Sequence, residues 1–243
     1  MNNNKIGIFD SGIGGLTVLE EIRKLLPNEE YYYYSDSLNN PYGEKTTDEL
    51  YEITSLVVEH LIKENAKIIV IACNTATTRC IDYLRDKYKD IIFIGTEPAI
   101  KVACDNGYKN ILLLATPLTI NSERTSFLVE HNKRKKGNIY LSACEGLAHA
   151  IEINDVKSEE RIINGIYQKY KDKNIDAIVL GCTHYPLIKE LIGKYFKDVI
   201  LLDGGLGVAK EVQRKLIENN LQSKSIGKVT IYNSLNKTNT TIF

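Results

Sequence analysis

Two short segments of the chain share one pattern, an apolar run that stops at a cysteine followed by small polar residues. They are residues 68–75, with the sequence IIVIACNT, and residues 177–184, with the sequence AIVLGCTH. A short, continuous apolar run is typical of a parallel strand that is buried on both faces. Functional groups in open α/β sheets gather where such strands end. The pattern therefore predicts two buried parallel strands, each followed by a thiol at the functional edge of its sheet.

The two thiols, Cys73 and Cys182, lie 109 positions apart, which is about the size of one small domain. This spacing indicates a duplicated half, in which a pseudo-twofold relationship would make the thiols face each other and form a two-base site. A free cysteine usually behaves as a small buried hydrophobe. The polar neighbours of these two cysteines are poor choices for filling a core and good choices for hydrogen bonding. The remaining cysteines lack such neighbours and are interpreted as core residues: Cys80, Cys104 and Cys144.

Charge and length exclude several functions. The chain has 243 residues, with 31 basic and 31 acidic side chains, so no overall field would attract nucleic acid or an anionic membrane. The first residues lack the apolar core of a signal peptide, and no apolar run reaches the length of a membrane span. Five cysteines without a close-set framework suit a reducing compartment. We expect a cytoplasmic protein that binds a small ligand.

Strand-like and helix-like segments alternate along the chain, which indicates an α/β fold with mainly parallel sheets. The expected strands are residues 5–10, 31–34, 67–72, 91–94, 110–115, 138–141, 176–181, 199–202 and 228–232. The expected helices are residues 15–26, 46–64, 75–89, 119–130, 147–153, 158–170, 186–196 and 205–218. We place the domain boundaries near Glu97 and Gly207. This gives a first α/β domain of residues 1–97 plus 208–243, a second of residues 98–207, and a shared cleft between them.

A glycine-rich turn, residues 10–15, follows the first strand and invites a dinucleotide-binding interpretation, helped by Asp36 after the second strand. The spacing does not fit, because Thr17 stands where the fingerprint requires its third glycine. We expect instead that the glycines let the backbone approach a small anion or carboxylate, with Asp10 and Ser11 directed into the cleft. A simple helix N-cap role for Asp10 is an equally good alternative.

Other polar residues stand at related places. Thr116 and Thr119 follow the first strand of the second half, where Asp10 and Ser11 follow the first strand of the first half. The loop of residues 39–43 combines a rigid proline with a permissive glycine and can expose backbone donors. Glu152 lies on a helix-like segment, and His184 comes two residues after Cys182.

These motifs, in this order and spacing, closely resemble the glutamate racemase family: residues 10–15, 41–43, 72–76 and 181–186. The resemblance implies a cofactor-independent isomerase that makes D-glutamate for peptidoglycan, built from two pseudo-symmetric α/β domains with the active site in the interdomain cleft. It also implies a homodimer. Cys73 would serve the D-enantiomer and Cys182 the L-enantiomer as acid/base residues, and the residues that would assist proton movement are Asp10, Glu152 and His184. The expected substrate-binding residues are Asp10, Ser11, Pro41, Tyr42, Gly43, Asn74, Thr75, Thr116, Thr119, Thr183 and His184.

The chemistry of racemisation suits two thiols. A proton leaves one face of the α-carbon and another arrives on the opposite face, so a base and a protonated partner must flank the substrate. A thiol with an ordinary pKa of about 8.5 can supply either form when a helix N-terminus or a histidine lies nearby. We therefore expect no cofactor and no metal. Three alternatives stay open: an aspartate-specific relative, a zinc enzyme using Cys73, Cys182 and His184, and a non-catalytic amino-acid-binding protein.

Overall fold

The computed structural model describes residues 4–132, 137–223 and 227–242. The chain divides into two compact units. The first combines Met1–Thr96 with Gly205–Phe243, and the second is Glu97–Gly204. None of the helices within the described ranges is long and apolar enough to cross a membrane.

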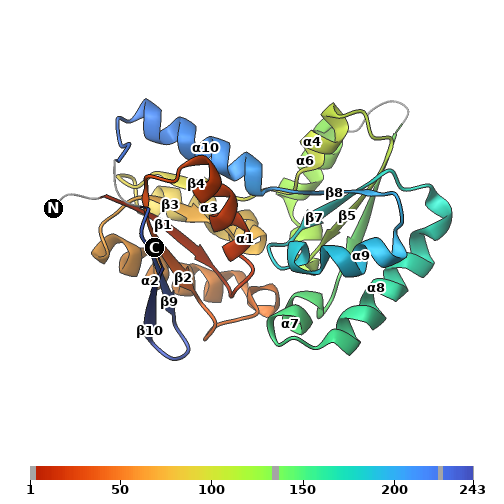
Figure 1. Ribbon diagram of the computed structural model, residues 1–243, viewed down its shortest axis with the longest axis horizontal. Helices are drawn as coiled ribbons and strands as arrows, with labels where there is room; N and C mark the ends of the chain where they lie inside the picture. Colours follow the sequence, from red (N-terminus) through yellow and green to blue (C-terminus); the bar gives the residue numbers. More distant parts are fainter. Residues whose placement is uncertain (1–3, 133–136, 224–226, 243) are drawn as a thin grey trace. The chain divides into compact units, whose positions relative to one another are not determined.

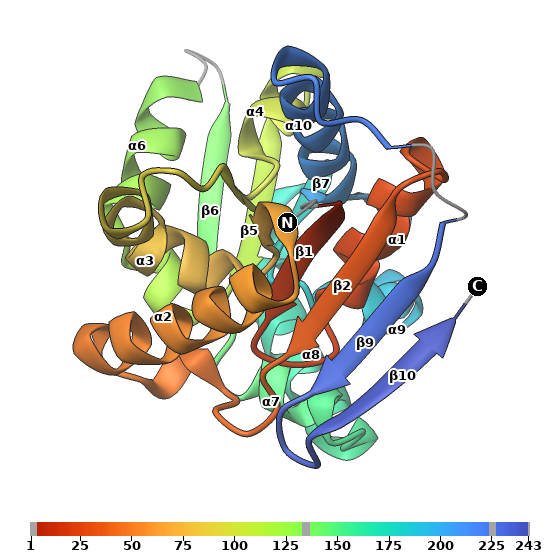
Figure 2. The same ribbon diagram turned by 90° about the vertical axis from the view of Figure 1, so that its left-hand side faces the viewer.

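The first unit is built on a six-stranded sheet with the order β10-β9-β2-β1-β3-β4. Its strands are β1 (Lys5–Asp10), β2 (Glu30–Ser35), β3 (Ala66–Ile71), β4 (Phe93–Gly95), β9 (Val229–Asn233) and β10 (Thr238–Ile242). Neighbouring strands are parallel except at the edge, where β10 runs antiparallel to β9. Figure 2 shows β10, β9, β2 and β1 side by side.

Helices cover both faces of this sheet. They are α1 (Leu16–Leu25), α2 (Thr47–Lys63), α3 (Asn74–Lys87) and α10 (Gly205–Glu218). On one face, α1 and α10 contribute residues such as Ile22 and Val212 to a cluster that includes Ile8 and Val70 of the strands. On the other face, α2 and α3 pack against β3 and against each other (Figure 2). Burial on both faces explains the apolar run of residues 68–71 in β3.

The second unit is built on a four-stranded parallel sheet with the order β6-β5-β7-β8. Its strands are β5 (Asn110–Ala115), β6 (Asn138–Ala143), β7 (Ala177–Gly181) and β8 (Ile200–Asp203). Its helices are α4 (Ile100–Asp105), α5 (Pro117–Ile120), α6 (Glu123–Asn132), α7 (Leu147–Glu152), α8 (Val156–Tyr170) and α9 (Lys189–Tyr195). Figure 1 shows α4 and α6 on one side of this sheet and α8 and α9 on the other.

The two units repeat one topology. In each, the four successive strands lie in the spatial order second, first, third, fourth, as β2-β1-β3-β4 and as β6-β5-β7-β8. The predicted α/β class with two related halves and mainly parallel sheets is therefore confirmed. The third strand of each unit, β3 or β7, is the apolar run that precedes Cys73 or Cys182.

Two predicted helices are interrupted. The helix expected over residues 119–130 is two helices, α5 and α6, with Ser122 between them. The Ser122 hydroxyl donates to the Thr119 carbonyl at the end of α5 and accepts the Thr125 N–H at the start of α6. The helix expected over residues 186–196 begins instead as a 3₁₀ turn, Tyr185–Ile188, before α9.

Helix α4 and strand β10 were not predicted. The helix α4 is only six residues long, too short for a periodic pattern to identify. The strand of residues 228–232 was expected to be the last, but the chain turns back after β9 and forms β10. The β10 sequence TNTTI is mostly polar, and Thr238, Asn239 and Thr240 are exposed, so apolar patterning gave no signal for this edge strand.

Candidate active site

The functional edge of the first unit lies where β1 and β3 end. These two strands are adjacent and parallel, and the chain leaves them toward β2 on one side and β4 on the other. Ligands in doubly wound sheets bind at such a switch point, beyond the carboxyl ends of the strands. Asp10 ends β1, and Cys73 follows β3 after one residue. The sheet topology therefore brings these two predicted site residues to one edge.

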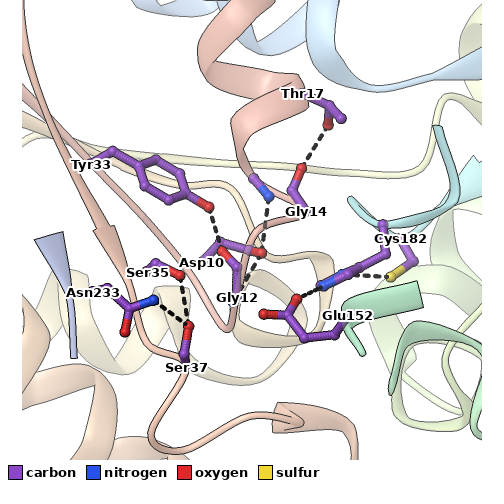
Figure 3. A network of polar contacts seen from close by, with 12 residues as sticks. Asp10, Gly12, Gly14, Thr17, Tyr33, Ser35, Ser37, Glu152, Cys182 and Asn233 are labelled. Atoms are coloured by element: carbon purple, nitrogen blue, oxygen red, sulfur yellow. Dashed lines mark hydrogen bonds and ion pairs between the residues drawn. The ribbon is translucent and has the colours of Figure 1, made fainter. Parts of the chain in front are cut away.

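The glycine-rich turn is organised around the buried Asp10 carboxylate. Its Oδ2 accepts hydrogen bonds from the N–H groups of Gly12, at 3.3 Å, and Gly15, at 3.0 Å (Figure 3). The Tyr33 hydroxyl donates to the Gly12 carbonyl at 2.6 Å. A Cβ at position 15 would lie 2.6 Å from the Asp10 Cβ and 2.7 Å from the Tyr33 hydroxyl. Gly15 thus permits close packing, and the Asp10 carboxylate holds the turn before α1. The N-cap residue of α1 is Gly15, so the alternative in which Asp10 is a simple N-cap is wrong.

Cys73 is the N-cap residue of α3. Its Sγ accepts a hydrogen bond from the Ala76 N–H at 3.5 Å, and its side chain is buried. An N–H donor at the positive end of a helix stabilises negative charge on sulfur. The next residues, Asn74 and Thr75, are also buried, and the Oδ1 atom of Asn74 is a buried acceptor without a hydrogen-bond partner in the described chain. Such an acceptor is costly unless a bound ligand donates to it.

The loop that contains Pro41, Tyr42 and Gly43 is held by Asp36. The buried Tyr42 hydroxyl donates to Asp36 Oδ2 at 2.7 Å. Burial, together with the negative charge of Asp36, raises the pKa of Tyr42 well above its ordinary value, so the phenol keeps its proton. Sequence reasoning considered Asp36 only as part of a dinucleotide motif and missed this contact. Its partners include Tyr42, six positions on, and Ser234, 198 positions on, and contacts of this kind form no periodic pattern in the sequence.

In the second unit, Cys182, His184 and Glu152 form a line of contacts. The His184 Nδ1 atom lies 3.9 Å from Cys182 Sγ, and its Nε2 atom lies 2.6 Å from Glu152 Oε2. Figure 3 marks the contacts that lead to Cys182 and to Glu152. The imidazole is buried, at 2% exposure of its side chain, and Glu152 at the end of α7 is 14% exposed. This arrangement can move a proton between the thiol and the ring.

The threonines of the second unit serve partly as caps. Thr116 is the N-cap of α5: its hydroxyl accepts the Thr119 N–H at 3.3 Å and donates to the Thr119 hydroxyl at 3.0 Å. Thr116 follows β5 as Ser11 follows β1, so the two occupy matching places in the repeated topology. Thr183 is buried between Cys182 and His184. Substrate contacts of all three threonines stay a prediction.

The other cysteines are buried, in line with their interpretation as core residues. Burial raises the pKa of Cys80 and of Cys144 to about 12. Neither thiol can supply a thiolate near neutral pH. Across residues 4–132, 137–223 and 227–242, no group of three or more His, Cys, Asp or Glu side chains could hold a metal ion.

The predicted site residues thus fall into two sets, one in each unit. The first set shares the β1–β3 edge and its flanking loop: Asp10, Ser11, Pro41, Tyr42, Gly43, Cys73, Asn74 and Thr75. The second set follows β5 and β7 or ends α7: Thr116, Thr119, Glu152, Cys182, Thr183 and His184.

Comparison with known proteins supports both the fold and the interpretation of the sequence motifs. The profile of the Asp/Glu/Hydantoin racemase family matches residues 11–212, which include both thiols. The chain belongs to this family. Among its relatives, the glutamate racemase of Clostridium novyi (strain NT) is 46% identical over 239 residues, covering 95% of this chain and 91% of that protein. The resemblance inferred from the motifs is confirmed at the level of the family.

Solved structures of family members share the fold. The glutamate racemase of Francisella tularensis, crystallised with D-glutamate, gives a TM-score of 0.81 at 33% identity, covering 96% of this chain and 89% of that one. The Escherichia coli glutamate racemase, in complex with L-glutamate and the activator UDP-MurNAc-ala, gives a TM-score of 0.83 at 30% identity, covering 95% and 88%. The family assignment makes the chain an isomerase of the amino-acid racemase type.

Proposed function

We propose that this chain interconverts L-glutamate and D-glutamate without a cofactor and supplies D-glutamate for peptidoglycan synthesis in the cytoplasm. One observation carries the proposal. Cys73 and Cys182 follow the third strand of two units that have the same strand order. The names of the family members similar to this chain supply the substrate, glutamate. A homodimer is part of the proposal and rests on the resemblance to the family.

The proposed mechanism uses one thiolate and one thiol. The thiolate removes the α-proton of glutamate and becomes a thiol, and the electron pair left on the α-carbon is delocalised into the substrate carboxylate. The second cysteine then donates its proton to the opposite face of the carbon and becomes a thiolate. The mechanism requires both sulfur atoms to reach the α-carbon of one bound glutamate. The reverse reaction exchanges the two roles.

Groups beside each sulfur support these roles. At Cys73, the Ala76 N–H and the start of α3 stabilise the thiolate. At Cys182, the His184 ring can accept the thiol proton through Nδ1, and Glu152 then stabilises the resulting imidazolium from Nε2. The two units therefore stabilise their thiolates by different means, a helix N-terminus in one and an imidazole in the other.

Polar groups of the first unit suit an amino acid. The buried Oδ1 of Asn74 can accept a hydrogen bond from the α-ammonium group, which would satisfy an otherwise unpaired acceptor. Backbone N–H groups near the glycine-rich turn and the loop at Tyr42 can donate to the carboxylates. Donors placed around the α-carboxylate lower the barrier most, because they stabilise the charge that develops when the α-proton leaves.

The test is exchange of the α-proton in deuterated water, followed with L-glutamate and L-aspartate and repeated with a chelator. We expect deuterium incorporation and loss of optical activity with glutamate, much slower reaction with aspartate, and no effect of the chelator. Faster reaction with aspartate would favour the aspartate-specific alternative, and loss of activity on chelation that zinc restores would favour the zinc enzyme. Binding of glutamate without exchange of its α-proton would favour the non-catalytic amino-acid-binding protein.

A further inference from the structure

We infer that Asp36 is a positioning residue of the site, whose carboxylate holds the Tyr42 loop in the conformation that binds substrate, and that Ser234 keeps this carboxylate in place. The inference rests on the proposed function, because it concerns how the same site holds glutamate. Asp36 follows β2, one residue beyond the strand's end at Ser35. It is one of the least exposed acidic residues described, at 1% exposure.

The Asp36 carboxylate accepts hydrogen bonds from three different side chains. Oδ2 accepts from the Tyr42 hydroxyl at 2.7 Å, and Oδ1 accepts from the Ser234 hydroxyl at 2.9 Å. The Asn39 amide nitrogen lies 3.1 Å from Oδ1 and 3.0 Å from Oδ2. A buried carboxylate is stable only when such donors surround it. Asn39 and Tyr42 lie in the loop itself, so the carboxylate joins the two ends of that loop.

The backbone connects this network to the glycine-rich turn. The Asp36 N–H donates to the carbonyl oxygen of Asp10 at 2.9 Å. Asp10 and Cys73 also lie close enough to the Tyr42 phenol to contribute to its raised pKa. Asp36 therefore connects the loop to the β1–β3 edge within the first unit. A displacement of Tyr42 would displace groups beside Cys73.

The contacts also indicate what the loop offers a ligand. The Tyr42 hydroxyl is already used as a donor to Asp36, and its ring is buried, so the loop binds through its backbone N–H groups and neighbouring side chains rather than through the phenol. The Nδ2 atom of Asn40, in the same loop, is a buried donor without a hydrogen-bond partner in the described chain. A carboxylate of the substrate would satisfy this donor.

Ser234 brings the C-terminal hairpin into the network. It follows β9, and 198 positions separate it from Asp36. Its hydroxyl donates to Asp36 and accepts from the Leu38 N–H at 3.0 Å, and its own N–H donates to the Ser35 carbonyl at 3.0 Å. The hairpin thereby fixes both the carboxylate and the loop backbone. Ser37 offers a matched comparison, because its hydroxyl accepts from Asn233 Nδ2 of the same hairpin at 3.2 Å and shares a hydrogen bond with the Ser35 hydroxyl at 3.0 Å.

The experiment measures kcat and KM for both enantiomers in five variants, together with the rise in melting temperature that saturating glutamate produces. In Asp36→Asn, one carboxylate oxygen becomes an amide nitrogen. This nitrogen is itself a donor, and it would face donor groups that need an acceptor. Ser234→Ala removes the second support of the carboxylate, and Ser234→Thr restores a hydroxyl. Ser37→Ala is the control. If Asp36→Asn does not fold, Ser234→Ala and Tyr42→Phe carry the test.

We expect Asp36→Asn and Ser234→Ala to raise KM about tenfold for both enantiomers, equivalent to about 1.4 kcal/mol, while kcat stays within about twofold. Ser234→Thr should recover most of the affinity, and Ser37→Ala should behave as the unmodified protein. A lowered melting temperature with unchanged KM, or a fall in kcat alone, would overturn the inference. If the unmodified protein binds glutamate but does not racemise it, the proposed function fails, and the glutamate-dependent melting shift still decides the role of Asp36.

Discussion

Glu152 holds the His184 imidazole through a 2.6 Å contact between Oε2 and Nε2, and the opposite nitrogen of the ring, Nδ1, then faces the sulfur of Cys182 at 3.9 Å. A carboxylate bonded to Nε2 favours the proton on that atom in the neutral ring, and the lone pair on Nδ1 can then accept a proton from the thiol. The pair therefore selects the tautomer that can activate Cys182.

Removing this pair should slow the step in which Cys182 acts as the base. We expect His184→Asn to lower kcat with L-glutamate by about 100-fold, and Glu152→Gln by less, because the amide can still orient the ring. The equilibrium constant of a racemisation is 1, so kcat/KM must fall equally for both enantiomers. The difference between the two enantiomers must therefore appear in kcat. Steady-state kinetics with each enantiomer measure it. Equal falls in both kcat values, with a lowered melting temperature, would indicate a structural role.

Each of the two thiols should be indispensable. Cys73→Ala and Cys182→Ala should abolish racemisation while the melting temperature stays within a few degrees, because each removes one of two proton carriers. The corresponding serine variants should retain exchange of the α-deuteron from one enantiomer only, D-glutamate when Cys73 remains and L-glutamate when Cys182 remains. Cys104→Ala is the control and should stay active. A loss of only a few-fold in either alanine variant contradicts the two-base mechanism.

Alkylation should distinguish the two classes of cysteine. With a pKa of about 12, Cys80 and Cys144 have about one thiolate in ten thousand molecules at pH 8. Iodoacetamide at pH 8 should therefore modify Cys73 and Cys182 long before these two, and glutamate should protect the reactive pair. Peptide mass spectrometry after timed quenching gives the rate at each site. Early modification of Cys144 in the folded protein is the contrary result.

A buried ion pair should be needed for the stability of the first unit. Lys67 Nζ lies 2.5 Å from Glu29 Oε2 and also donates to the Leu221 carbonyl at 2.7 Å, and the two side chains are 2% and 4% exposed. Glu29→Gln would leave the ammonium group buried without its counter-charge. We expect a loss of about 3–5 kcal/mol in the free energy of unfolding, measured by urea titration. Glu20→Gln, which affects the exposed contact with Lys24, should change it by less than about 0.5 kcal/mol.

His60 should make stability depend on pH. Burial lowers the pKa of His60 below its ordinary 6.5, and the ring accepts or donates one hydrogen bond with the Tyr32 hydroxyl at 2.9 Å. A base with a lowered pKa in the folded state contributes stability above its unfolded pKa and loses it as pH falls through the folded value. Urea midpoints should therefore fall below pH 6.5 more steeply in the unmodified protein than in His60→Gln. If the urea midpoint falls equally steeply with pH in both proteins, His60 is not the group responsible.

The apolar runs before Cys73 and Cys182 could be identified from sequence because a strand buried on both faces is mainly apolar along its length. Lys67 of β3 is an exception, since its charge is paired with Glu29. The repeated topology, the turn at Asp10 and the family then followed from local patterns and their order along the chain. Boundaries were least accurate where short-range capping decided them, as at Ser122, which ends α5 and begins α6 through its own hydroxyl.

The amino-acid sequence by itself determined which chemistry the chain carries, because strand periodicity places thiols, a histidine and a glycine-rich turn at strand ends regardless of distant contacts. Only the tertiary structure decided which groups support that chemistry. One partner of His184, Glu152, lies 32 positions away on α7, and one partner of Asp36, Ser234, lies 198 positions away beside β9. Such pairs cannot be recognised from the periodicity of the sequence. A hydrogen bond between remote residues constrains only the two side chains that form it and not the hydrophobic pattern of their neighbours.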